Sequence, residues 1–219
     1  ESHNLDTLPG KDRIYLSWQQ FHKHLRDAMS GARRVAMQYS PMNAIPYISR
    51  VDAGTVELVR HLGIEVVSSA NLVQIFEAVW TEAQFKTHLY AAKNLREIVD
   101  EAFSEVGRRT REGIATNEFD IQNFIWSQFD LRDLTSSDRP IVAVNANSAD
   151  PHYTPDIHCK VSINKGDFLL IDLWAKQRVP QSVYADITWT GYVGEPLPTR
   201  YEKIFSVVRD GRDAALQLV

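Results

Sequence analysis

Two apolar stretches decide the fold: GDFLLIDLW at residues 166–174, followed by VYADITWT at residues 183–190. Each run contains one aspartate among apolar and β-branched residues, Asp172 in the first and Asp186 in the second. Runs of this length and composition predict β-strands that lie inside a sheet. A carboxylate in such surroundings loses its hydration, so it needs a hydrogen bond, a charged partner or a metal ion.

The pair of aspartates predicts a metal site. If the two strands form an antiparallel hairpin, Asp172 and Asp186 can lie directly opposite one another, with Cβ atoms ~4.5–5.5 Å apart. Two like charges at that separation need a counter-charge to stay ionised together. Divalent cations supply it, and carboxylate oxygens suit Mn, Mg or a borderline metal. The alternative is that Asp172 is a turn residue at a strand end and Asp186 a surface partner of an arginine.

Further strands are predicted at 141–144 and 160–163, and a helix from Thr199 onward. His152 lies in the loop after the first of these strands, a position where catalytic side chains are often found. From the local sequence alone, however, a single histidine in a loop is better read as an ordinary polar residue. We therefore take His152 as a candidate only in combination with other motifs.

The middle of the chain is helical. Residues 72–80 predict a short helix with one apolar face, and Thr81-Glu82-Ala83-Gln84 has the form of a capping box that begins a helix ending near Glu105. Another helix is expected at about 117–129.

The first 80 residues alternate between helix and strand. We expect a helix at 17–29, a strand at 33–39, a helix at 52–62 and a strand at 64–67. Strand, helix and strand with brief links predict a βαβ unit. We place a domain boundary near residue 80, in a stretch without a glycine- or serine-rich linker.

Composition excludes several classes of protein. The 219 residues carry a net charge of −4, and 44% are hydrophobic, which suits a globular chain with a core and disfavours nucleic-acid binding. The basic cluster Arg108–Arg111 is read as a solvated helix end. The single cysteine, Cys159, permits no intramolecular disulfide and fits a reducing compartment. No apolar run is long enough to span a membrane.

Three motifs, in order, resemble the pita-bread metallopeptidases, the family of aminopeptidase P, prolidase, methionine aminopeptidase and creatinase. They are 145–154 with His152, 166–172 and 184–190; Gly113 with Thr116-Asn117-Glu118 is similar to that family's turn between two helices. The resemblance implies an α/β N-terminal part and an α+β pita-bread catalytic domain. It assigns residues 1–80 to the end of a creatinase-type N-terminal domain and residues 81–219 to the first part of the catalytic domain.

The resemblance also implies a function. Asp172 and Asp186 match metal ligands, and His152 matches a histidine that binds substrate or stabilises the transition state. Two divalent ions, Mn, Co or Zn, are then expected to activate a water that attacks an N-terminal peptide bond, often one before proline. The expected setting is a cytoplasmic homodimer with a peptide substrate and no nucleic-acid or membrane partner.

The sequence lacks some of the metal ligands that the resemblance implies, which limits the activity expected of this chain. A further histidine and two glutamate ligands are implied downstream of Asp186, where the chain has no histidine and Glu195 and Glu202 come too early. We therefore expect a C-terminally incomplete catalytic domain that is inactive by itself. The segment from Leu173 to Ala185 is also longer than the usual hairpin of the family. Two alternatives stay open: a non-catalytic peptide-binding module, and a metal-free creatinase-like hydrolase that uses His152.

Overall fold

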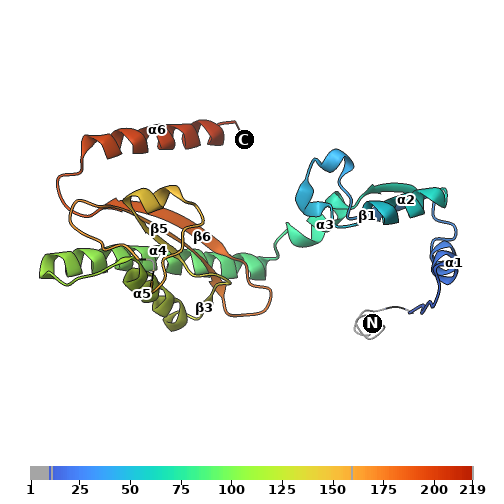
Figure 1. Ribbon diagram of the computed structural model, residues 1–219, viewed down its shortest axis with the longest axis horizontal. Coiled ribbons are helices and arrows are strands. Elements are labelled where there is room, and N and C mark those ends of the chain that lie inside the picture. The colour runs from blue at the N-terminus through green and yellow to red at the C-terminus, as the bar shows by residue number, and fades with distance from the viewer. Residues whose placement is uncertain (1–9, 11, 159, 219) are drawn as a thin grey trace. The chain divides into compact units, whose positions relative to one another are not determined.

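The chain divides into two compact units, Glu1–Val79 and Trp80–Val219 (Figure 1). The computed structural model describes residue 10 and residues 12–158 and 160–218. Cys159 lies outside the described residues. The assignment of the two units to particular domains of a family stays a prediction.

The first unit is built on the predicted βαβ motif. Strands β1 (Arg34–Met37) and β2 (Glu65–Ser68) pair in parallel, and helix α2 (Ala53–His61) connects them. The helix begins after Asp52, whose carboxylate accepts a hydrogen bond from the backbone N–H of Thr55 at 2.9 Å. The parallel pairing that the sequence predicts is confirmed, but only the link from α2 to β2, residues 62–64, is brief. Residues 38–52, which include the short helices η2 (Pro41–Asn43) and η3 (Pro46–Ile48), connect β1 to α2.

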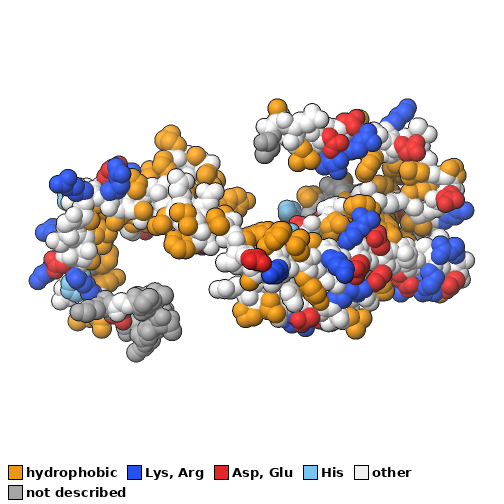
Figure 2. Space-filling model, turned by 180° about the vertical axis from the view of Figure 1, so that it is seen from behind, with side chains coloured by type: hydrophobic (Ala, Val, Ile, Leu, Met, Phe, Trp, Pro, Cys, Tyr) orange, Lys and Arg blue, Asp and Glu red, His pale blue; other side chains and the backbone are white. Residues whose placement is uncertain are grey.

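The core of the first unit is small, and much apolar surface remains exposed. Helices α1 (Trp18–Ala28) and α3 (Ala70–Glu77) have no buried residue. The apolar face predicted near residues 72–80 lies on the surface, where Figure 2 displays hydrophobic side chains across this unit. The buried apolar residues are Val56, Val59, Ile64 and Val66.

The second unit begins with its longest helix, α4 (Glu82–Glu112). The capping box is confirmed: Thr81 Oγ1 accepts the N–H of Gln84 at 3.2 Å, and the side chain of Gln84 accepts the N–H of Thr81 at 2.8 Å. The expected end near Glu105 is wrong, because the helix continues to a left-handed glycine cap at Gly113, with φ 69°.

Ion pairs within the last turns of α4 explain this continuation. Glu105 contacts Arg108 at 2.8 Å and Arg109 at 2.7 Å, and Arg108 also pairs with Glu112. These are partners three and four residues apart, which stabilise a helix. The hydrogen bonds from the two arginines lower the pKa of Glu105 to about 2. The basic cluster thus consists partly of ion-paired residues of the helix itself.

The sheet of the second unit is centred on β5 (Phe168–Gln177). Strands β4 (Ile141–Val144) and β6 (Ala185–Tyr192) pair antiparallel with overlapping parts of β5, so they lie on its opposite edges. The two-residue strand β3 (Leu134–Thr135) pairs with the end of β5. The strand predicted at 160–163 is wrong: only an isolated bridge from Ser162 to Asn117 forms there.

The two faces of β5 differ in burial. Successive side chains of a strand point to opposite faces, and Leu169, Ile171 and Leu173 are fully buried. They join the core that includes residues of α4 and of α5 (Glu118–Leu131), the helices on one side of the sheet in Figure 1. The intervening residues are partly exposed. We call their side the open face.

The last element is helix α6 (Thr199–Leu216), which has no buried residue. Its first turn contacts the sheet, because the ring of Tyr201 stacks on Phe168 with 5.2 Å between ring centroids. Among the helices of the described residues, none combines the length and apolar character that a membrane span requires.

Candidate metal centre

The two aspartates lie on neighbouring strands but are not directly opposite. Asp172 pairs with Thr188, and Asp186 pairs with Trp174, so the predicted direct opposition is wrong by two residues. The register at the end of the hairpin, where Ala175 pairs with Ala185, sets this offset. Diagonal neighbours of this kind are typically ~7–8 Å apart.

The aspartates nevertheless share one face of the sheet. Asp172 and Trp174 are two residues apart on β5, so they point to the same side, and Asp186 points to that side as the partner of Trp174. This is the open face. Asp172 lies within the strand rather than at its end, which excludes the turn-residue alternative. The part of the chain that the structure describes also provides no arginine ion pair for Asp186.

The surroundings of Asp186 disfavour its ionised form. Partial burial, followed by the negative charge of Asp172, raises the pKa of Asp186 above its ordinary value. A nearby cation would oppose both effects, because it favours the ionised carboxylate. The two carboxylates therefore still repel one another at the diagonal separation, and the need for a counter-charge stays a prediction.

Thr188 is a residue of this site that the sequence analysis missed. Its hydroxyl donates a hydrogen bond of 2.8 Å to Asp172 Oδ1. The hydrogen bond fixes one carboxylate oxygen of Asp172 across the strand pair. Its signal in the sequence is the spacing Asp186-x-Thr188, which places both side chains on the same face.

These residues fit a divalent metal as part of a ligand set. Carboxylate oxygens are hard donors of the kind that Mn²⁺ and Mg²⁺ prefer, and two of them lie on one face of the sheet. Within residues 12–158 and 160–218, no third His, Cys, Asp or Glu joins the two aspartates in a metal-binding group. The pair is therefore an incomplete centre in this stretch of chain.

His152 lies elsewhere in the second unit. It follows the short helix η4 (Asn145–Ala149) in the connection between β4 and β5, and its side chain is exposed. Its backbone N–H donates to Asp150 Oδ1 at 2.9 Å. The structure does not bring it into one group with the aspartates, so its catalytic role stays a prediction.

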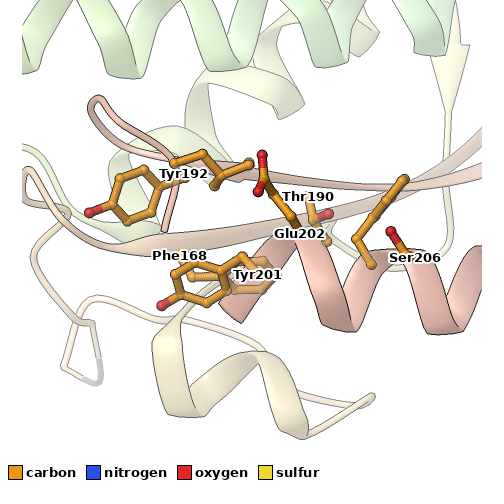
Figure 3. Close-up of a pocket in the computed structure, with 9 residues that line it drawn as sticks. Phe168, Thr190, Tyr192, Tyr201, Glu202 and Ser206 are labelled. Carbon is orange, nitrogen blue, oxygen red and sulfur yellow. The ribbon is translucent and has the colours of Figure 1, made fainter. Parts of the chain in front are cut away.

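A cavity of about 550 Å³ opens further along the open face (Figure 3). Phe168 and Thr190 line it from the sheet, and Tyr201 and Glu202 line it from α6. Phe168 is four residues before Asp172 on β5, so both point to the same side. The lining combines the apolar side chains of Phe168, Leu197 and Phe205 with polar groups that include Glu202 and Ser206.

Residues 91–219 match the model of Metallopeptidase family M24. The chain belongs to metallopeptidase family M24. This M24 segment includes both aspartates, His152 and the whole sheet of the second unit. Comparison of the sequence with curated proteins finds no match.

Solved structures share the fold of this M24 chain. X-Pro aminopeptidase from Thermotoga maritima is 20% identical, with a TM-score of 0.54 over 96% of this chain and 53% of that one. Prolidase from Thermococcus sibiricus is 21% identical, with a TM-score of 0.58 over 99% and 55%. X-prolyl aminopeptidase from Caenorhabditis elegans, a cytosolic enzyme with a di-nuclear active site, is 20% identical, with a TM-score of 0.52 over 65% and 23%. The chain thus spans about half the length of the first two.

Proposed function

We propose that Asp172 and Asp186 are two ligands of a two-metal centre in a metal-dependent exopeptidase. The proposed substrate is a peptide whose N-terminal bond precedes proline, and the proposed metal is Mn²⁺, Co²⁺ or Zn²⁺. One observation carries the proposal: in an M24 chain, the two carboxylates share one face of the sheet, and the pKa of Asp186 is raised. The neighbours titled aminopeptidase and prolidase support the substrate class.

Each residue of the proposed centre has its own role. Asp172 offers a carboxylate that Thr188 orients through its hydroxyl. Asp186 offers a second carboxylate, whose ionised form a cation would stabilise. When bound, the metals would lower the pKa of a water and polarise the scissile carbonyl. His152 is proposed to donate a hydrogen bond to the substrate.

A non-catalytic peptide-binding module is the second candidate. The observation in its favour is that the described residues gather only two of the carboxylate or histidine ligands of a metal centre. We accordingly expect the 219-residue chain by itself to hydrolyse no peptide. The homodimer and the cytoplasmic location are parts of the same proposal, and the outer edge of β6, which pairs with no described strand, is a surface on which a second copy can dock.

Metal binding by this chain is the first test. Titration calorimetry with Mn²⁺ is expected to give saturable binding that Asp172→Asn or Asp186→Asn weakens at least about tenfold. The matched control is Asp138→Asn, which removes the same charge from an exposed loop. Equal binding by all four proteins would contradict the assignment of the ligands.

Peptide hydrolysis is the second test, carried out on the product of the complete gene that carries this sequence. Cleavage of an Xaa-Pro peptide should require Mn²⁺ and should be abolished by Asp172→Asn. If metal binds but no peptide is cleaved, the binding-module proposal replaces the peptidase proposal. If no metal binds, the metal-free hydrolase becomes the remaining enzyme hypothesis.

A further inference from the structure

A fully buried carboxylate lies at the first residue of α5, outside the candidate metal centre. The side chain of Glu118 has no exposed surface. Its Oε1 accepts hydrogen bonds from the N–H of Val144 at 2.7 Å and from Asn147 Nδ2 at 3.0 Å. Its Oε2 accepts from the hydroxyl of Tyr153 at 2.6 Å and from the N–H of Val161 at 2.9 Å. Four donors thus compensate the loss of hydration of this carboxylate.

All four donors belong to one segment of the chain, residues 144–161. Val144 is the last residue of β4, Val161 lies near the far end of the connection to β5, and the other two donors lie between them. His152 precedes Tyr153 directly. Connections of this length are usually mobile unless side chains fix them. The carboxylate of Glu118 therefore ties both ends and the middle of the segment that carries His152.

A second set of hydrogen bonds attaches the start of this segment to β5. The side chain of Asn145 donates to Asp167 Oδ1 at 2.8 Å and accepts the N–H of Phe168 at 3.0 Å. Asn145 has a φ of 49°, a left-handed conformation that asparagine tolerates better than most residues. The segment is thus fixed both to α5 and to the strand that carries Asp172.

We propose that Glu118 is a positioning residue: it holds residues 144–158 and the N–H of Val161 in place and so positions His152 for the reaction. The inference rests on the function proposed for His152. Helix capping does not account for Glu118, because Asn117 and Asp120 already form a capping box at this end of α5. A buried charge is also a poor source of stability compared with an apolar side chain of the same size. Holding the segment is what its four hydrogen bonds accomplish.

The first experiment measures amide hydrogen exchange in this chain. Glu118→Gln keeps the shape but replaces one oxygen with an amide nitrogen that cannot accept, so the N–H of either Val144 or Val161 loses its partner. Exchange in residues 144–161 should accelerate about tenfold or more, while the core amides of α4 stay protected. Asp120→Asn is the matched control, since it removes the same charge from the same helix turn without touching the segment. Unchanged exchange in 144–161, or equal acceleration in the control, overturns the proposal.

A less disruptive substitution tests the same proposal in case Glu118→Gln fails to fold. Tyr153→Phe keeps the ring and deletes one of the four donors to Glu118. It should accelerate exchange in the same segment, by a smaller factor than Glu118→Gln. An effect spread over the whole second unit would instead indicate a purely structural role and would overturn the proposal.

The second experiment measures kinetics in the product of the complete gene. Glu118→Gln should lower kcat for an Xaa-Pro peptide about 10–100-fold, through misplacement of His152, with KM and the affinity for Mn²⁺ little changed. An unchanged kcat despite a loosened segment overturns the positioning role. If the wild-type protein cleaves nothing, the proposed function fails, whereas the exchange experiment still decides whether Glu118 holds the segment.

Discussion

Replacing Gly191 with alanine tests how β6 packs against α4. A Cβ atom at this position would lie 2.6 Å from Cε1 and 3.1 Å from Cδ1 of Phe103. The ring of Phe103, on α4, must therefore move, and overpacking of this kind costs about 1–3 kcal/mol. Because the same strand carries Asp186, the substitution also tests the support of the candidate metal centre.

The expected effect can be expressed as a change in Tm. Unfolding entropy is about 2.1 cal/mol/K per residue, so for a unit of about 140 residues a loss of 1–3 kcal/mol lowers Tm by roughly 3–10 °C. Circular dichroism during heating measures it directly. The matched control is Gly211→Ala in α6, where a Cβ meets no atom within 4 Å. That variant should keep or slightly raise Tm, because alanine favours a helix over glycine.

A double-mutant cycle identifies the contact. Phe103→Leu removes the ring that obstructs the new methyl group, so Gly191→Ala should cost less in this background than alone, with a coupling energy of about 0.5–3 kcal/mol. Two results would refute the reasoning: a Gly191→Ala protein as stable as the wild type, or two substitutions whose effects simply add.

Three further predictions concern charges. Burial and the charge of Asp172 raise the pKa of Asp186 in the folded protein, so ionisation of Asp186 opposes folding. Without metal, the free energy of unfolding should therefore fall as pH rises above about 3.9. Urea titrations at several pH values measure this fall, and Asp186→Asn should remove it. Hydrogen bonds from Arg108, and then those from Arg109, lower the pKa of Glu105 to about 2. The stability that Glu105 contributes is therefore complete above the ordinary pKa of 4.5 and is lost as pH falls toward 2. In Glu105→Gln this loss of stability at low pH should disappear. Thr188→Val removes the hydroxyl that orients Asp172 and should weaken Mn²⁺ binding about tenfold in calorimetry, and an unchanged affinity would contradict that role.

Local sequence signals predicted the elements whose ends are fixed by their own side chains. The capping box at Thr81 and Gln84 marks the start of α4, and Asp52 marks the start of α2, because each side chain bonds a backbone N–H three residues away. The βαβ order of the first unit follows from the local helix and strand patterns of its elements. The end of α4 was missed, since its last turns depend on ion pairs of Glu105 that helical periodicity does not reveal.

Features that depend on distant partners were predicted less well. The sequence placed Asp172 and Asp186 on adjacent strands but missed their two-residue offset, which the pairing at the end of the hairpin sets. Strand β3 is two residues long and has no periodicity to detect. The role of Glu118 depends on donors as far away as Val161, so its sequence neighbours give no sign of them.

The hairpin connection at residues 178–184 lies outside the paired parts of β5 and β6. Insertions or deletions there therefore leave the pairing register of both aspartates unchanged. One residue inserted between Asp172 and Ala175 would instead turn Asp172 toward the helices while Asp186 stayed on the open face. Hydrogen bonds of Arg178 with Asp130 and of Val183 with Thr87 hold the two ends of the connection, so evolution can change its length between those ends, whereas a few strand residues below it tolerate no change of length.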